Sequence, residues 1–214
     1  MSNARIKIGL DWDETVLDHL TGYLRYHNLK YKTFYEKKDI HNYQLWKVLG
    51  NKNGDLLSCD ELLYDLLEFY WSKDFLKLGF INGAVAGINF LKRKGYDLSV
   101  VTSRPTFIEG ETRLSMERCS PRAFSGLHFA RGHFSPNRSL LTKAEIFVRE
   151  KFDIGVEDFP DNAAEIASKG IPVIVPRHPW NNYFLENNSN NNIYPADDWM
   201  GKKGIIKKIE EILG

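Results

Sequence analysis

One stretch, IKIGLDWDETV at residues 6–16, decides the fold predicted for this chain. Apolar residues alternate with Lys and Gly as far as Leu10, and three acids follow within four positions, which is the pattern of a buried strand opening onto a polar end. In an open α/β sheet ligands bind at the carboxyl ends of the strands, so Asp11 and Asp13 are candidates for chemistry. A bare Asp-x-Asp pair is more often a turn and a helix cap, so the rest of the chain has to decide.

Length and composition narrow the choice of function. A chain of 214 residues can form one domain with a sizeable insertion, or two small domains. Lys and Arg number 29 against 28 Asp and Glu, and this net charge of +1 gives no overall field to attract nucleic acid or a membrane. Cys59 and Cys119 lack the paired spacing of a zinc site, and no apolar run is as long as a signal peptide or a membrane span. We therefore expect free thiols and a cytoplasmic protein.

The pattern changes after the first strand. Residues 17–29 carry apolar side chains at helical spacing, and residues 31–80 are rich in aromatics. Ser58 and Glu61 have the spacing of a capping box, which starts a helix that continues to about Trp71. We interpret this part of the chain as a small helical insertion.

The aromatic side chains of the insertion have two possible uses. A short helical unit needs large side chains to bury enough area, so most of these rings are expected in its own core, and stacking on a ligand is the open alternative. The rings that we consider best placed for a ligand lie outside the strongest helical stripe: Phe34, Tyr35, Tyr43 and Trp46. Three rings that share one helix are expected to pack inside the insertion: Tyr64, Phe69 and Tyr70.

A second polar strand end follows. The strand predicted over 96–101 ends in Thr102 and Ser103, and a capping-box spacing from Thr106 to Glu109 opens a helix behind them. Hydroxyls and backbone amides at such a place can hold an oxyanion. Helix capping alone explains the same residues about as well.

Lys143 lies in an unusual place for a cation. Thr142 and Glu145 have capping-box spacing, which puts Lys143 in the first turn of a helix, where the helix dipole disfavours positive charge. A negative group nearby would compensate. A solvated lysine is the alternative, because its cost there is only a few tenths of a kcal/mol.

The last polar strand end carries two acids, Glu157 and Asp158, after a short apolar strand. Asp161 is expected to cap a helix over 162–169, which Gly170 closes.

Strands and helices alternate along most of the chain. Another strand is predicted over 171–175, and isoleucines at helical spacing predict a final amphipathic helix over 205–212. Residues 181–192 contain seven asparagines and are predicted to form a solvated loop. The alternation favours an α/β fold in which a parallel sheet is covered by helices on both faces.

Taken together, these strand ends resemble the four motifs of the haloacid dehalogenase superfamily of phosphatases. They are, in chain order, Asp11-x-Asp13-x-Thr15, Thr102, Lys143 and Glu157-Asp158. The resemblance spans residues 6–175 and implies a Rossmann-like parallel sheet with a small helical cap inserted after the first strand. The core would comprise 1–17 and 81–214, and the cap 18–80.

Other segments are similar to a narrower group, the 5′(3′)-deoxyribonucleotidase family. These are the insertion itself, the run Glu157-Asp158-x-Pro160-Asp161-Asn162-Ala163, the run Gly170-Ile171-Pro172-Val173 and the motif His178-Pro179-Trp180-Asn181. That family usually has Gly where this chain has Glu14, and Trp12 is also unusual. Residues 12–16 resemble instead the Asp-x-Asp-Glu-Thr box of carboxy-terminal-domain protein phosphatases.

The resemblance implies a Mg²⁺-dependent phosphatase that works through an aspartyl-phosphate. Asp11 would attack phosphorus, and Asp13 would protonate the leaving alkoxide and then deprotonate the attacking water. Mg²⁺ prefers hard oxygen ligands, which Asp11, Asp158 and the backbone carbonyl of Asp13 would supply. Dehalogenases need no acid two residues after the nucleophile, so Asp13 favours a phosphatase.

The remaining residues have supporting roles in this scheme. Thr102, Ser103 and Lys143 would hold the phosphoryl oxygens, and Glu157 would order metal-bound water from behind the ligands. The expected substrate is a small phosphate monoester, preferably a nucleoside or deoxynucleoside monophosphate. The alternatives are a polynucleotide 3′-end or protein phosphatase, disfavoured by the charge balance and the insertion, and a catalytically silent binding module. Neither a nucleic acid polymer nor a membrane is an expected partner, and the sequence indicates no oligomeric state.

Overall fold

The computed structural model describes residues 5–132 and 140–214. Its centre is a six-stranded sheet in the order β3-β2-β1-β4-β5-β6, in which every neighbouring pair is parallel. The strands are β1 (Lys7–Leu10), β2 (Asp97–Thr102), β3 (Phe124–Phe129), β4 (Ile154–Val156), β5 (Val173–Pro176) and β6 (Ile193–Ala196). The predicted α/β fold class is confirmed, and the stretch that ends in Asp11 lies between two other strands.

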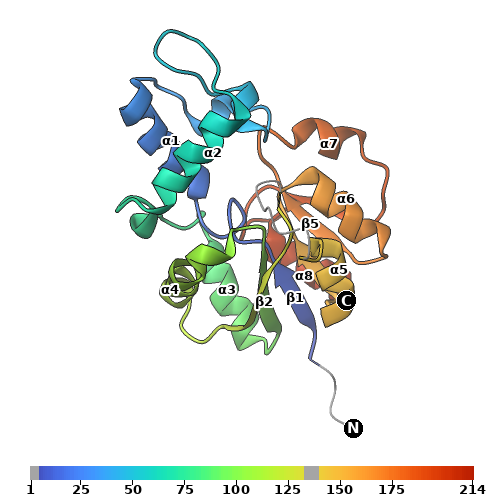
Figure 1. The fold of residues 1–214 in the computed structure, drawn as a ribbon. Helices are drawn as coiled ribbons and strands as arrows, with labels where there is room; N and C mark the ends of the chain where they lie inside the picture. Colours follow the sequence, from blue (N-terminus) through green and yellow to red (C-terminus); the bar gives the residue numbers. More distant parts are fainter. Residues whose placement is uncertain (1–4, 133–139) are drawn as a thin grey trace.

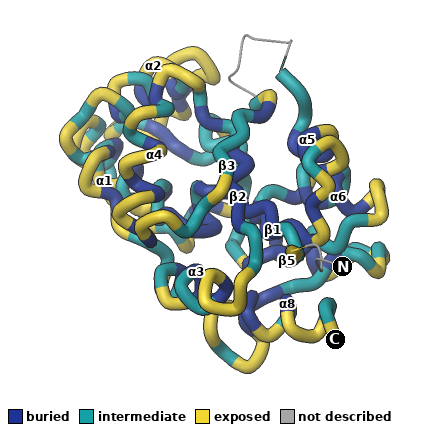
Figure 2. The backbone as a smooth tube through the Cα atoms, turned by 90° about the horizontal axis from the view of Figure 1, so that it is seen from below, coloured by how far each residue is buried: buried dark blue, intermediate teal, exposed yellow. Residues whose placement is uncertain are grey.

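Helices cover both faces of the sheet (Figure 1). One face packs against α3 (Ala84–Arg93), α4 (Glu109–Cys119) and α8 (Ile205–Leu213), and the other against α5 (Lys143–Glu150) and α6 (Pro160–Ser168). In Figure 2 the central strands β1, β2 and β5 are mostly buried between helices whose outer sides are exposed. Successive residues of β2 point to opposite faces, so that Val100 packs in the layer of α3, α4 and α8 and Val101 in the layer of α5 and α6. The strand is therefore buried on both faces.

Two glycines fix how closely α5 approaches the sheet. Gly9 in β1 and Gly155 in β4 are paired in register, and both lie under the ring of Phe147. A Cβ on Gly9 would come within 2.5 Å of that ring, and a Cβ on Gly155 within 2.9 Å. The two positions therefore need glycine so that the ring can pack directly on the backbone.

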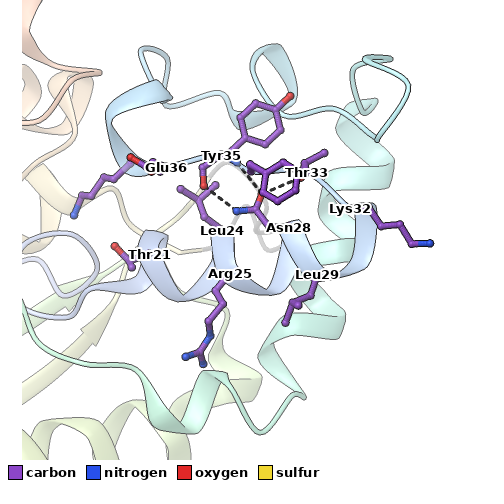
Figure 3. Close-up of a pocket in the computed structure, with 11 residues that line it drawn as sticks. Thr21, Leu24, Arg25, Asn28, Leu29, Lys32, Thr33, Tyr35 and Glu36 are labelled. Atoms are coloured by element: carbon purple, nitrogen blue, oxygen red, sulfur yellow. Dashed lines mark hydrogen bonds between the residues drawn. The ribbon is translucent and has the colours of Figure 1, made fainter.

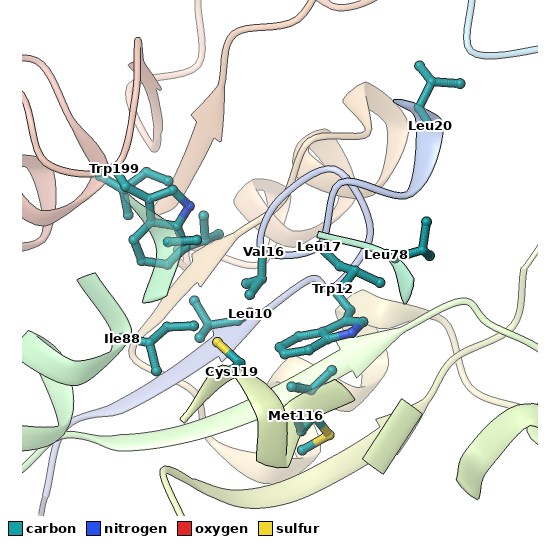
Figure 4. Close-up of a cluster of buried hydrophobic side chains, with 14 of the residues drawn as sticks. Leu10, Trp12, Val16, Leu17, Leu20, Leu78, Ile88, Met116, Cys119 and Trp199 are labelled. Atoms are coloured by element: carbon teal, nitrogen blue, oxygen red, sulfur yellow. The ribbon is translucent and has the colours of Figure 1, made fainter. Parts of the chain in front are cut away.

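Trp12, which lies between Asp11 and Asp13 in the sequence, is a core residue. It lies among Leu10, Met116 and Cys119 in Figure 4 and is fully buried. Its indole Nε1 donates a hydrogen bond to Ser115 Oγ at 2.9 Å, so burial leaves no unpaired donor. The side chain between the two aspartates thus anchors the end of β1 to α4.

The insertion after β1 is helical, as predicted. It contains α1 (His19–Tyr31), α2 (Cys59–Tyr70) and three short 3₁₀ helices, η1 (Lys37–Asp39), η2 (Leu45–Lys47) and η3 (Phe75–Lys77). Its two connections to the sheet run side by side, because Leu17 pairs with Phe80 and Asp18 N donates to Gly79 O at 3.0 Å. The division into a core of 1–17 and 81–214 and a cap of 18–80 stays a prediction.

Several local predictions can be compared with the structure. The capping boxes at Ser58 and Thr142 are formed. The box from Thr106 to Glu109 is wrong, because a 3₁₀ turn, η4 (Thr106–Ile108), comes first and α4 begins after Ile108 without a side-chain cap. Asp161 does not cap α6, since Pro160 occupies the first helical position.

Two strands and one helix were not predicted. The edge strand β3 contains Ser and Gly, and the opposite edge strand β6 contains Pro195, so neither has the apolar pattern of a central strand. The asparagine-rich segment holds α7 (Asn182–Asn187), which buries Leu185 against the sheet layer. In the described ranges, no helix combines the length and the apolar character needed to cross a bilayer.

Candidate functional site

A cavity of about 490 Å³ lies between the carboxyl edge of the sheet and the insertion. It is lined by every side chain that the sequence singled out for chemistry: Asp11, Asp13, Thr102, Ser103, Lys143, Glu157 and Asp158. They come from three adjacent strands and the start of α5. The structure therefore brings the whole predicted set together, while the role of each residue stays a prediction.

Lys143 joins two of the acids. Its Nζ lies 2.7 Å from Asp11 Oδ1 and 2.6 Å from Glu157 Oε2, and the side chain is almost fully buried. Burial disfavours the charged amine, but Asp11 and Glu157 outweigh it and raise the pKa of Lys143 above its usual range. The negative partners that a lysine in a first helical turn requires are present, and Lys143 is a fixed cation.

Three acids form a compact buried group. Asp11, Glu157 and Asp158 can each turn one carboxylate oxygen toward the others so that these oxygens lie within 4.8 Å of one another. Burial, followed by the charge of Asp11, raises the pKa of both Glu157 and Asp158. In the described part of the chain, Lys143 is the lysine that pairs with these three carboxylates, so a divalent cation with a preference for oxygen ligands would relieve the excess negative charge.

Glu157 is the least suited of the three to ligate a cation. Its Oε2 accepts from Lys143, and its Oε1 accepts from Phe159 N at 3.1 Å and Asn162 Nδ2 at 3.3 Å. Both oxygens are thus in use. Asp11 and Asp158 fit a Mg²⁺ site best, and Glu157 holds Lys143 in place.

Asp13 has a partner that the sequence analysis missed. The Arg104 guanidinium binds it through two hydrogen bonds, from Nε to Oδ2 at 2.7 Å and from Nη2 to Oδ1 at 2.6 Å. Burial would raise the pKa of Asp13, but Arg104 prevails and lowers it. Arg104 is itself held by Thr112 Oγ1 at 3.1 Å. In this arrangement Asp13 is an ionised carboxylate, and it can protonate a leaving group only after it parts from Arg104.

Thr102 ends β2 beside Asp11 and Asp13. Its Oγ1 accepts a hydrogen bond from Arg104 N at 3.2 Å, which leaves the hydroxyl proton to donate elsewhere. Ser103 lines the same cavity. Both residues lie at the cavity where the sequence analysis placed donors for an anion, and that role stays a prediction.

Part of the insertion forms an apolar wall of the cavity. Tyr43, Leu45 and Trp46 line it from one segment, and Leu66 and Tyr70 from α2. The Tyr43 ring packs edge-on against Phe159 at 4.2 Å between centroids, so this segment contacts the sheet part directly.

The aromatic expectations were half right. Tyr43 and Trp46 face the cavity, whereas Phe34 is 93% exposed on another side and the Tyr35 hydroxyl accepts from Gly50 N within the insertion. Tyr64 is exposed on α2, and Tyr70 lines the cavity, so both differ from the predicted interior packing. Phe69 is fully buried, as expected.

A second cavity, of about 610 Å³, lies on the outer side of the insertion (Figure 3). It is bounded by α1 and by residues 32–37, and none of the acids described above lines it. The residues that line it include no group of neighbouring acids and lysine like the one at the sheet edge. The chemistry is therefore assigned to the cavity at the sheet edge.

Arg131 is a further cation at that cavity which the sequence analysis missed. It follows β3, and because β3 was not predicted, nothing in the pattern placed Arg131 at a strand end. Arg104 could have been noticed, because it lies two residues after Thr102 on a predicted strand end.

The chain shares its fold with hydrolases of known structure. A haloacid dehalogenase-like family hydrolase from Streptococcus pneumoniae is 14% identical with a TM-score of 0.66, over 98% of this chain and 99% of the other. A predicted phosphoglycolate phosphatase from Haemophilus somnus is 17% identical with a TM-score of 0.65, over the full length of both chains. A predicted phosphatase from Clostridium acetobutylicum is 16% identical with a TM-score of 0.63, over 99% of both. No protein-family model and no curated protein sequence matches.

Proposed function

We propose that this protein is a Mg²⁺-dependent phosphatase of small phosphate monoesters. The observation that carries the proposal is the group at the end of β1, where Asp11 contacts buried Lys143 and lies beside Asp158. A carboxylate nucleophile, a fixed cation for the phosphoryl oxygens and oxygen ligands for a metal are the parts that phosphoryl transfer needs. The shared haloacid dehalogenase-like fold supports the same reading at the level of architecture.

In this proposal the two aspartates that follow β1 carry out the chemical steps, and the other residues bind the phosphoryl group and the metal. Asp11 attacks phosphorus and becomes an aspartyl-phosphate while the alkoxide leaves. Asp13, which first parts from Arg104 and takes up a proton from solvent, protonates that alkoxide. Asp13 then removes a proton from the water that hydrolyses the intermediate. Lys143, Thr102 and Ser103 hold the phosphoryl oxygens. Asp11, Asp158 and the Asp13 carbonyl would hold Mg²⁺, which supplies positive charge for the substrate dianion.

We infer further that the substrate is a nucleoside or deoxynucleoside monophosphate. The apolar wall that contains Tyr43, Trp46 and Tyr70 supports this, because a base can stack on aromatic rings opposite the phosphate site. The cavity volume of about 490 Å³ is within the usual range of about 300–1,000 Å³ for small ligands. Polymer and protein phosphatases are disfavoured because the insertion closes one side of the cavity. Free Cys59 and Cys119 support a reducing, cytoplasmic setting.

The test is a screen of phosphate monoesters with Mg²⁺ that measures released phosphate. We expect mononucleotides to be hydrolysed and Asp11→Asn to be inactive on every substrate. Asp13→Asn should retain slow transfer from an activated aryl phosphate, since a good leaving group needs less proton donation. Equal loss on alkyl and aryl esters would contradict the role of Asp13, and a protein that hydrolyses no monoester would be a binding module.

A further inference from the structure

The motif His178-Pro179-Trp180-Asn181 follows β5 and has no task in the proposed mechanism, yet it surrounds one of the acids. The Trp180 Nε1 donates a hydrogen bond to Asp158 Oδ2 at 3.1 Å. The Asn181 side chain is fully buried, and its Nδ2 donates to the backbone carbonyls of Asp158 and Pro176, each at 2.9 Å. Asp158 is thus held at both its carboxylate and its backbone.

Trp180 is itself held from several sides. Its ring is stacked on His178, with the centroids 4.3 Å apart and the planes at 10°. His178 Nε2 donates to the carbonyl of Glu14 at 2.8 Å, and His178 N donates to Asn181 Oδ1 at 2.9 Å. Lys37 of the insertion lies 5.9 Å from the Trp180 ring centre. The indole N–H therefore points at Asp158 from a fixed position.

The hydrogen bond from Trp180 makes the two carboxylate oxygens of Asp158 unequal. Oδ2 accepts the indole N–H, whereas no side chain in the described parts of the chain donates a hydrogen bond to Oδ1. We propose that Trp180 is a positioning residue for the metal ligand Asp158, occupying Oδ2 and keeping Oδ1 for a divalent cation. This inference rests on the proposed function, since it assigns a residue that acts through its metal site.

The physical reason is pre-organisation. Asp158 lies close to two other buried carboxylates, whose charges would drive a free side chain away from them. A hydrogen bond from a fixed donor keeps the carboxylate in a ligating orientation before the cation arrives. Removal of such an outer partner of a metal ligand typically lowers metal affinity by about 10- to 100-fold.

Trp180→Phe tests the inference, because it retains a ring that can stack on His178 and removes the N–H. We expect the Kd for Mg²⁺, measured by calorimetry without substrate, to rise about tenfold or more. The matched control is Trp199→Phe. Trp199 likewise donates its indole N–H, but its acceptor is the backbone carbonyl of Thr15, at 2.8 Å, and not Asp158. Trp199→Phe should therefore lower the stability of the protein and leave the Kd for Mg²⁺ unchanged.

Asp158→Asn distinguishes a failure of the metal site from a failure of the positioning role of Trp180. It should weaken Mg²⁺ binding strongly. Trp180→Phe added to it should weaken binding no further, because the carboxylate that Trp180 positions is no longer present. If Asp158→Asn weakens binding while Trp180→Phe alone binds Mg²⁺ as tightly as the wild type, the positioning role is wrong and the metal site stands. If Asp158→Asn binds Mg²⁺ like the wild type, the proposed metal site fails and the role of Trp180 fails with it.

Discussion

Glu14 is held in a conformation that suits glycine better. Its φ of 59° is in the left-handed region, which a residue without a Cβ adopts at no steric cost. The carboxylate is buried, pairs with Lys37 of the insertion and accepts a hydrogen bond from Leu20 N. Burial raises its pKa to about 7 even though Lys37 acts in the opposite direction. The side chain thus links the end of β1 to the insertion at the expense of backbone strain.

This strain can be measured with two variants that both lose the carboxylate. Glu14→Gly should be more stable than Glu14→Ala by about 1 kcal/mol, because only glycine adopts the left-handed conformation without a Cβ penalty. Denaturant unfolding of the two proteins gives the difference. If the alanine variant were as stable as the glycine variant, Glu14 would not be strained.

At the scale of elements, the insertion presents its aromatic rings to two different sides. Trp46 lines the cavity at the sheet edge, and Phe34 lies on the outer cavity with 93% of its surface exposed. The two rings belong to the same irregular stretch between α1 and α2, so they make a matched pair.

Trp46→Ala should raise KM for a mononucleotide and leave KM for a base-free aryl phosphate almost unchanged. Loss of base stacking corresponds to about 1 to 3 kcal/mol. Phe34→Ala should change neither value. Steady-state kinetics on both substrates provide the measurement, and a parallel loss on both substrates by Trp46→Ala would make a generic small-metabolite phosphatase the better interpretation.

A buried polar network joins α1 to α2. Asp65 of α2 is fully buried, accepts the Tyr23 hydroxyl at 2.7 Å and lies 2.8 Å from Lys30 Nζ. Burial would raise the pKa of Asp65, but the bonds from His27, Lys30 and Tyr23 together lower it. Because the folded pKa lies below the unfolded value of about 3.9, ionised Asp65 stabilises the fold above that pH.

Asp65→Asn should therefore be less stable than the wild type near neutral pH. The stability that Asp65 contributes is present above about pH 4 and is lost as the pH falls through the lowered folded pKa. Thermal unfolding of both proteins between about pH 3 and pH 7 should show that the difference between their melting temperatures decreases toward the acid end. A difference in melting temperature that does not change with pH would mean that the charge of Asp65 does not contribute to stability.

At the scale of the whole molecule, the site is completed by both parts of the chain. The sheet supplies the acids and Lys143, while the insertion supplies the apolar wall and contacts the sheet part through Tyr43 on Phe159 and Lys37 beside Glu14. A hydrophobic cluster continues between the parts through Leu17, shown with Leu20 and Leu78 in Figure 4. Binding of a cation at Asp11, Glu157 and Asp158 should consequently raise the free energy of unfolding of the entire protein.

Mg²⁺ should raise the melting temperature, because its binding relieves repulsion among Asp11, Glu157 and Asp158 in the folded state alone. At about 100 times its Kd the ion stabilises by about 2.7 kcal/mol. Chelation should abolish activity, Mg²⁺ should restore it, and Ca²⁺ should support it poorly because it prefers more ligands in a looser shell. Full activity in chelator, or an equal melting shift in Asp158→Asn, would contradict the metal site.

The sequence by itself determined the parallel α/β fold and predicted which acids, hydroxyls and lysine lie together at the carboxyl edge of the sheet. Both follow from local patterns, because short apolar strands that end in polar residues must place those residues on one edge when the strands are parallel. The position of Lys143 followed from the capping box formed by Thr142 and Glu145, three residues apart. These features need no knowledge of what lies across the fold, and the structure reproduces them.

Only the tertiary structure decided how the site residues are paired. Arg104 reaches Asp13 across 91 residues of chain and Trp180 reaches Asp158 across 22, and no local pattern encodes such distances. The edge strands β3 and β6 are likewise defined by pairing with a neighbour and not by apolar alternation of their own. The directions of Phe34 and Trp46 depend on which surface packs against the sheet, because a ring in a loop or in a single 3₁₀ turn has too short a periodic stretch around it to fix its face.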